Sequence, residues 1–142
     1  MSFESFNLHP QLAKDSVLVC SLDLCQVRMI NDDNYPWFLL IPQQNNVTEL
    51  HQLSVAQHQL LTKESRILSL AIENCFTPAK LNVASIGNMV AQLHVHHIAR
   101  FTTDIAWPKP VWGFAKMRAY APTECERRIK QMTLEIDKQR LM

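Results

Sequence analysis

Short apolar runs separated by polar turns dominate the first third of the chain. Residues 16–22, 25–31 and 37–41 are apolar or β-branched and have the length of strands. The polar stretch 31–36 contains a proline and is typical of a turn, because its side chains hydrogen-bond the local backbone. Three strands so close in sequence predict an antiparallel meander. Before the first strand we expect a loop with at most a short helix around residues 11–14.

A helical pattern follows these strands. The Ser-x-x-Gln sequence at residues 54–57 is a capping box, and apolar residues then recur at three- and four-residue intervals over residues 55–75. This pattern predicts a long helix with one apolar stripe packed on the sheet. Glu64 falls largely off the stripe, and His51 and His58 are expected in solvent.

Two further strands are predicted around a glycine. Residues 79–86 and 90–101 are strand candidates, and Gly87 lies at the turn between them. A glycine there can adopt positive φ and allows close approach of the backbone or a ligand.

The second of these strands carries the candidate chemistry. Alternate side chains of a strand share one face, so Gln92, His94 and His96 are expected on the same side. Two imidazoles and a carboxamide at this spacing fit an object the size of a phosphate group. A histidine-rich strand with one buried and one wet face is the alternative interpretation. His97 lies on the other, mostly apolar face, which favours a structural histidine.

The last third of the chain contains an aromatic segment and a helix. Prolines fix the backbone of residues 107–113, which either fill a hydrophobic hole or line a pocket. A second capping box at residues 123–126 predicts a charged helix over 124–141. Its narrow apolar stripe consists of Ile129, Met132 and Ile136.

Composition narrows the class of protein. The chain has 142 residues, 47% of them apolar, and a net charge of +1, so no broad basic surface for nucleic acid or membrane is evident. No apolar run is long enough for a membrane span, and we expect no leader, because no basic-then-apolar pattern is present at the amino end. Four cysteines lack the paired spacing of a metal site and are expected as reduced thiols. We therefore expect one cytoplasmic domain over residues 1–142.

Several fragments together resemble the histidine-triad (HIT) family. These fragments are Asn82, the Gly87-Asn88 turn, Gln92-Leu93-His94-Val95-His96 and Trp107-Pro108. The family pattern is His-φ-His-φ-His-φ-φ, where φ is apolar; here Gln92 replaces the first histidine and His97 occupies a usually apolar position. Upstream, residues 29–42 resemble the strand-turn-strand that holds the nucleoside. The resemblance covers roughly residues 17–113, with a C-terminal helical extension at about 122–141.

The resemblance implies an α+β fold, with a meandering antiparallel sheet, one long helix and a C-terminal helix, usually paired into a homodimer. It also implies nucleotide hydrolysis or transfer at the α-phosphate, without a metal or other cofactor. His94 would attack phosphorus and form a nucleotidyl-histidine intermediate, and His96 would bond the phosphate. Gln92 could donate to a phosphate oxygen but could not carry charge, so weakened or redirected activity is expected.

The same resemblance assigns a nucleotide-binding set. Asn31 matches the position that binds the ribose, with Asp32 in the same turn, and Asn82 and Asn88 match polar positions flanking the phosphate. Trp107 completes the set. The substrate would be a nucleoside phosphoramidate or a dinucleoside polyphosphate, although the leaving group and base are open.

Two other functions remain open at this point. A nucleotide-binding module that has lost catalysis predicts binding without a covalent His94 adduct. A metal site could use His94 and His96 with His97 or a cysteine, although no third ligand at suitable spacing is evident.

Overall fold

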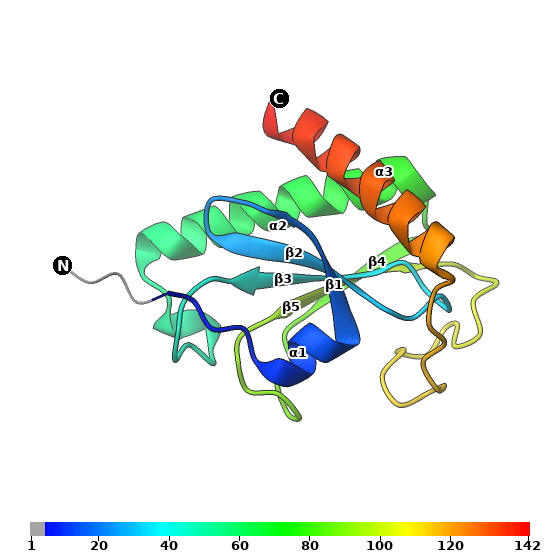
Figure 1. Ribbon diagram of the computed structural model, residues 1–142, viewed down its shortest axis with the longest axis horizontal. Helices are drawn as coiled ribbons and strands as arrows, with labels where there is room; N and C mark the ends of the chain where they lie inside the picture. Colours follow the sequence, from blue (N-terminus) through cyan, green and yellow to red (C-terminus); the bar gives the residue numbers. More distant parts are fainter. Residues whose placement is uncertain (1–4) are drawn as a thin grey trace.

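The computed structural model describes residues 5–142 and contains a five-stranded antiparallel sheet with helices (Figure 1). The strand order is β1-β2-β3-β5-β4, and each neighbouring pair is antiparallel. The strands are β1 (Ser16–Ser21), β2 (Cys25–Ile30), β3 (Trp37–Pro42), β4 (Lys80–Ala84) and β5 (Val95–Arg100). The first three strands form the predicted meander, and the predicted α+β fold is confirmed.

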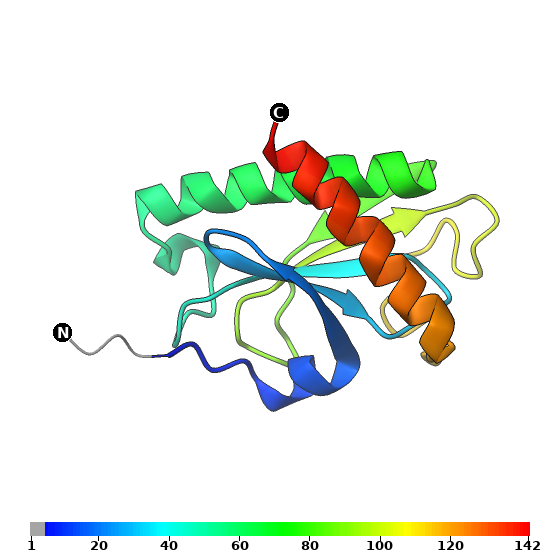
Figure 2. The same cartoon turned by 45° about the horizontal axis from the view of Figure 1, so that its top comes forward.

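The helices lie on both sides of this sheet. They are α1 (Pro10–Asp15), the short 3₁₀ turn η1 (Leu50–Gln52), α2 (Val55–Phe76) and α3 (Pro122–Arg140). Figures 1 and 2 show α2 along one face of the sheet with α3 lying across it, and α1 on the opposite side. No helix within residues 5–142 has the length and apolar character needed to cross a membrane.

Both faces of the central strands are covered, which explains their nearly continuous apolar sequence. The face toward α2 and α3 buries Phe38, Leu40 and Val95 together with Met132 and Ile136 of α3. The opposite face carries a second cluster that α1 and the 105–113 segment cover. Its members include Leu12, Trp37, Leu39, Ile41, Ile98 and Val111. The functional site lies on this second face.

The two predicted capping boxes have different outcomes. In α2, Ser54 Oγ accepts from the Gln57 amide, and Gln57 Oε1 accepts from the Ser54 amide, as predicted. The second box is wrong, because α3 begins at Pro122 with Ala121 as its N-cap and no side-chain cap. Proline at the first helical position has the helical φ already fixed and has no N–H that needs a partner, so the helix begins two residues before the predicted start at Glu124.

Strand β5 is shorter than the predicted 90–101 strand. It begins at Val95, which pairs with Leu40 near the end of β3. The preceding Leu93 amide donates to Val47 in the connector after β3 instead of continuing the ladder. Gln92 and His94 therefore lie before the strand, and strict alternation does not determine the direction of the Gln92 side chain.

Glu64 departs from the expectation for a residue off the apolar stripe. Its side chain is only 3% exposed, and its two carboxylate oxygens accept from the amides of Leu24 (2.7 Å) and Cys25 (2.9 Å). These amides lie at the turn between β1 and β2, so the carboxylate ties α2 to the first hairpin. The helical period identifies the face of the helix on which a residue lies. Its burial also depends on the neighbouring loop, here on two backbone amides that need an acceptor.

We expect Glu64→Ala to lower the free energy of unfolding by about 2–4 kcal/mol, because it leaves two backbone amides without their charged acceptor. Urea unfolding followed by circular dichroism measures this change. Lys63→Ala, at the exposed neighbouring position, is the control and should change stability by less than about 0.5 kcal/mol. Equal stabilities of the two variants would contradict this role for Glu64.

Candidate functional site

A cavity of about 440 Å³ lies on the second face of the sheet, between α1, the loop after β4 and the segment that precedes α3. Its polar side chains are Asp15, Asn88, His94 and His96. Its walls are otherwise apolar and include Leu12, Ile30, Trp37, Leu39, Ile86, Met89, Val90, Trp112 and Met117. Gly87 also lines it, with the positive φ of 72° expected for this turn. The cavity is therefore an apolar hollow with two imidazoles at one place in its wall.

His94 is oriented by its own backbone. Its Nδ1 lies 2.7 Å from the Gln92 carbonyl oxygen. A carbonyl oxygen can only accept, so Nδ1 carries the proton and donates it. In the neutral ring the lone pair is then on Nε2, which makes no hydrogen bond within the described chain.

His96 is held the opposite way round. The Trp37 indole Nε1 donates to His96 Nδ1 at 3.0 Å, so in the neutral ring the proton is on Nε2. The ring also packs against Trp112, with the centroids 5.1 Å apart. Burial, followed by the neighbouring imidazoles of His94 and His97, lowers the pKa of His96 to about 3. His96 is therefore a neutral donor at physiological pH.

The two imidazoles are adjacent and chemically distinct. Their ring centroids lie 5.0 Å apart at an interplanar angle of 69°. His94 has an available lone pair on Nε2, while His96 has an available N–H at the same position of its ring. A nucleophile beside a hydrogen-bond donor is the arrangement that attack on a phosphoryl or acyl centre requires.

His97 lies outside this cavity, as predicted. It is fully buried on the α2 side of the sheet, with Nε2 at 2.8 Å from Ser65 Oγ and Nδ1 at 3.1 Å from the Val95 carbonyl. Burial lowers its pKa to about 4, an effect that the Val95 carbonyl partly opposes. Its role is to connect β5 to α2.

Gln92 does not line the cavity. Its Oε1 accepts from the His9 amide at 2.8 Å, and its Nε2 donates to the Asn7 carbonyl at 2.9 Å. The expected hydrogen bond from this side chain to a phosphate has no support in the observed geometry, because the carboxamide is directed at the N-terminal segment. The physical reason is the late start of β5, which frees Gln92 from the strand alternation.

Asn31 and Asp32 also bond to the protein rather than lining the cavity. Asn31 Oδ1 accepts from the Tyr120 amide at 2.9 Å. Asp32 is 1% exposed, and its Oδ1 accepts from the amides of Asn34 and Arg118. Both side chains therefore anchor the segment that brings Met117 to the cavity wall.

Asn82 has a similar structural role on the other side of the site. Its Oδ1 accepts from Arg100, whose guanidinium is 2% exposed and forms a bidentate ion pair with Asp104. Burial would raise the pKa of Asp104, but hydrogen bonds from Arg100 and from the backbone hold it below its ordinary value. Asp104 in turn accepts from the Trp107 amide, so this network positions the aromatic segment 107–113.

The aromatic segment 107–113 both fills a hydrophobic space and lines the cavity, the two alternatives that the sequence left open. Val111 is buried in the second core cluster, whereas Trp112 lines the cavity beside His96. Trp107, the predicted nucleotide contact, is 36% exposed and stacks near the Arg100 guanidinium instead of lining the cavity.

Comparison with known proteins identifies the family. The HIT domain family model matches residues 11–103. A histidine triad protein from Bradyrhizobium japonicum is 41% identical, with coverage of 94% of this chain and 99% of that one and a TM-score of 0.89. A histidine triad protein from Marinobacter aquaeolei VT8 is 36% identical, with coverage of 96% of this chain and 99% of that one and a TM-score of 0.92. The chain belongs to the HIT family.

HIT proteins bind nucleotides and often act on nucleotide phosphates. A more distant structure, Plasmodium falciparum diadenosine triphosphate hydrolase, shares the fold at 13% identity. The match covers 97% of this chain and 88% of that one, with a TM-score of 0.62. No curated protein matched the chain.

Three residues of this HIT site were missed by sequence reasoning. Trp37 was interpreted only as part of a buried strand, although the β3–β5 register places Leu39 opposite His96 and Trp37 two residues away on the same face. Trp112 was included only in an undecided segment. No sequence pattern indicates Asp15, at the end of α1, because it lines the cavity only as a result of how the N-terminal segment packs on the sheet.

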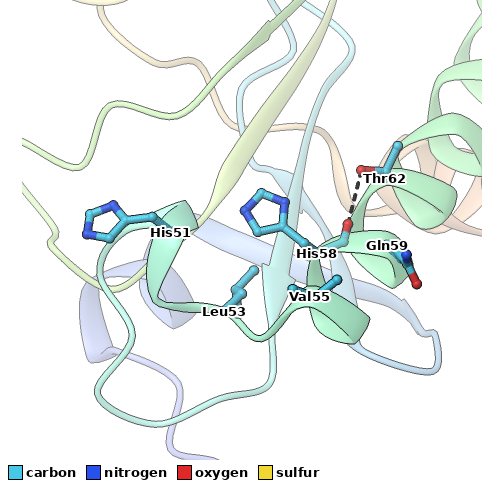
Figure 3. A pocket seen from close by; sticks show the side chains of 6 residues that line it. All are labelled: His51, Leu53, Val55, His58, Gln59 and Thr62. Carbon is cyan, nitrogen blue, oxygen red and sulfur yellow. Dashed lines mark hydrogen bonds between the residues drawn. The ribbon is translucent and has the colours of Figure 1, made fainter.

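A second hollow lies away from the HIT site, at the start of α2. Figure 3 shows His51 from η1 and His58 from α2 beside Val55 and Thr62. Both histidines are exposed, as expected, and the lining includes no carboxylate or cysteine. Across residues 5–142 no three side chains of the metal-ligating types gather into a group.

We expect the HIT protein to lose stability as the pH falls below 6.5. His96 and His97 have lowered pKa values in the folded state, so the unfolded chain binds more protons, and stability is full above pH 6.5 and decreases toward pH 4. Each histidine contributes a slope of up to about 1.4 kcal/mol per pH unit. Urea unfolding at several pH values measures the slope.

His97→Leu should remove about half of this slope, because one of the two buried imidazoles is gone. His58→Leu, at an exposed position, is the matched control and should leave the slope unchanged. A slope that persists undiminished in His97→Leu would contradict the assignment.

Proposed function

We propose that this HIT protein cleaves or transfers a nucleotide at its α-phosphate, with His94 as the nucleophile. The observation that carries the proposal is the fixed tautomer of His94, since its Nδ1–H is bonded to the Gln92 carbonyl and its Nε2 lone pair remains free at the cavity. Attack forms a bond from Nε2 to phosphorus while the bond to the leaving group breaks. Water then cleaves the nucleotidyl-histidine, or an acceptor takes the nucleotide.

His96 supports the same step as a neutral donor. Its Nε2–H can bond a phosphate oxygen while Trp37 holds Nδ1, and burial, which lowers its pKa to about 3, keeps the ring neutral before substrate binds. Stabilisation of the transition state therefore comes from an oriented N–H in a largely apolar cavity rather than from a positive charge.

The charge of the cavity favours one class of substrate. Among residues 5–142, no lysine or arginine side chain lines it, whereas the Asp15 carboxylate does. The several negative charges of a dinucleoside polyphosphate would meet no formal cation there. The apolar side chains Ile86, Met89 and Met117 in the wall suit an uncharged leaving group. We therefore favour a nucleoside monophosphate joined to a neutral group, such as a phosphoramidate.

The test of the nucleophile uses adenosine phosphoramidate labelled at phosphorus. Rapid acid-free denaturation during turnover should trap label on the protein, and His94→Ala should lose both the adduct and about a thousandfold or more in kcat. His58→Ala, remote from the cavity, is the control and should retain both. Tight AMP binding with neither adduct nor turnover would show a binding module instead.

The test of substrate class compares two adenosine compounds at equal ionic strength. We expect kcat/KM for adenosine phosphoramidate to exceed that for diadenosine tetraphosphate by at least about tenfold, because the polyphosphate brings uncompensated charge to the cavity. Equal or reversed values, measured with the same preparation, would contradict the charge argument while leaving His94 as nucleophile.

A further inference from the structure

Residues 5–15, called here the N-terminal strap, form one wall of the cavity. Leu12 and Asp15 of α1 line it directly. Leu12 is 4% exposed, and Phe6 and Leu8 pack partly buried against the same core cluster. The strap thus has apolar contacts beneath it, but α1 is only six residues long and cannot hold its position by helix formation alone.

Two carboxamides bind the backbone of the strap in succession. Asn45 Nδ2 donates to the Ser5 carbonyl at 3.0 Å, and Asn45 Oδ1 accepts from the Asn7 amide at 2.9 Å. Gln92 continues the series, with Nε2 on the Asn7 carbonyl and Oε1 on the His9 amide. Four backbone groups of an extended segment are thereby satisfied as a neighbouring strand would satisfy them.

Glutamine suits this task better than histidine. A carboxamide presents a donor and an acceptor side by side on one planar group, which matches the carbonyl of one residue and the amide two residues later. The two nitrogens of an imidazole diverge, so the ring cannot bond both groups in this way. The replacement of the first triad histidine therefore has a structural consequence beyond the loss of a charge.

Gln92 also contacts the nucleophile. Its backbone carbonyl accepts from His94 Nδ1, while its side chain holds the strap. Beyond Gln92, the His9 side chain caps α1 by accepting from the Gln11 amide, and the Gln11 side chain donates from Nε2 to Asp15 Oδ2 at 2.9 Å. A continuous set of hydrogen bonds thus runs from His94 through Gln92 to the cavity wall.

We propose that Gln92 is a positioning residue that fastens the N-terminal strap over the nucleotide cavity and joins it to the backbone that orients His94. This inference rests on the proposed function for its effect on substrate, but the fastening itself is independent of nucleotide. A loosened strap lowers the fraction of protein with a complete cavity wall, which raises the apparent dissociation constant without altering the chemistry of bound substrate.

The experiment compares Gln92→Met and Asn45→Ala in the full chain. Each removes one carboxamide from the strap, and we expect amide hydrogen exchange in residues 6–15 to accelerate about tenfold in Gln92→Met. KM for adenosine phosphoramidate should rise about threefold or more, with kcat within twofold of the parent. Asn45→Ala should change both quantities in the same direction, and it carries the test if Gln92→Met does not fold.

Gln43→Met is the matched control. Gln43 also bonds a backbone carbonyl, that of Leu24, but makes no hydrogen bond to residues 5–15, so exchange in residues 6–15 and KM should stay at parental values. Gln92→His separates the two roles of position 92. If Gln92 fastens the strap, this variant raises exchange and KM as Gln92→Met does; a higher kcat at unchanged KM would show direct action on phosphate and overturn the proposal.

The exchange measurement distinguishes failure here from failure of the proposed function. Unchanged exchange in both Gln92→Met and Asn45→Ala overturns the fastening, whatever the protein does to nucleotides. Accelerated exchange with unchanged KM overturns the link to the cavity. If the parent turns over no nucleotide, the AMP dissociation constant replaces KM, and absence of AMP binding overturns both the link and the proposed function.

Discussion

The site depends on two hydrogen bonds in which the chemistry of one partner fixes which atom donates. A backbone carbonyl can only accept and an indole N–H can only donate, so the Gln92 carbonyl and Trp37 assign opposite tautomers to His94 and His96. If either bond were reversed, the cavity would contain two donors or two acceptors. The sheet, through the β3–β5 register that places Trp37 near His96, is what holds this assignment in place.

The polar residues around the site mostly hold its walls. Asn31 and Asp32 bind the backbone of the segment that contains Met117, and Asn82 joins the Arg100–Asp104 pair, which bonds the start of the 107–113 segment. An amide or carboxylate that already accepts hydrogen bonds within the protein is costly to redirect toward a ligand. The cavity is therefore pre-formed by side chains that resemble ligand contacts in the sequence but have their partners within the protein.

The sequence predicts the layers of this fold well and the site only in part. The apolar runs of β1 to β3 and the period of α2 follow from burial, so their positions were predicted within a residue or two. The direction of Gln92 could not be predicted, because it depends on where β5 stops pairing with β3. Glu64 was missed for a similar reason, since its burial is set by two amides of a distant turn. Local sequence patterns specify which helices and strands form. The contacts of Gln92 and Glu64 depend instead on which distant loops pack against them.

The absence of a cation at position 92 agrees with the rest of the cavity. His96 is neutral, Asp15 lies in the wall, and no lysine or arginine among residues 5–142 lines the cavity, so Gln92 is one more position near the site without a formal positive charge. Under the proposed function, a carboxamide that binds the strap at this position shifts the basis of recognition from charge to enclosure. Apolar burial of a nucleoside depends on a complete wall, whereas a salt bridge to phosphate does not. If Gln92 fastens the strap as proposed, the residue that brings no charge is also the residue that completes the apolar wall.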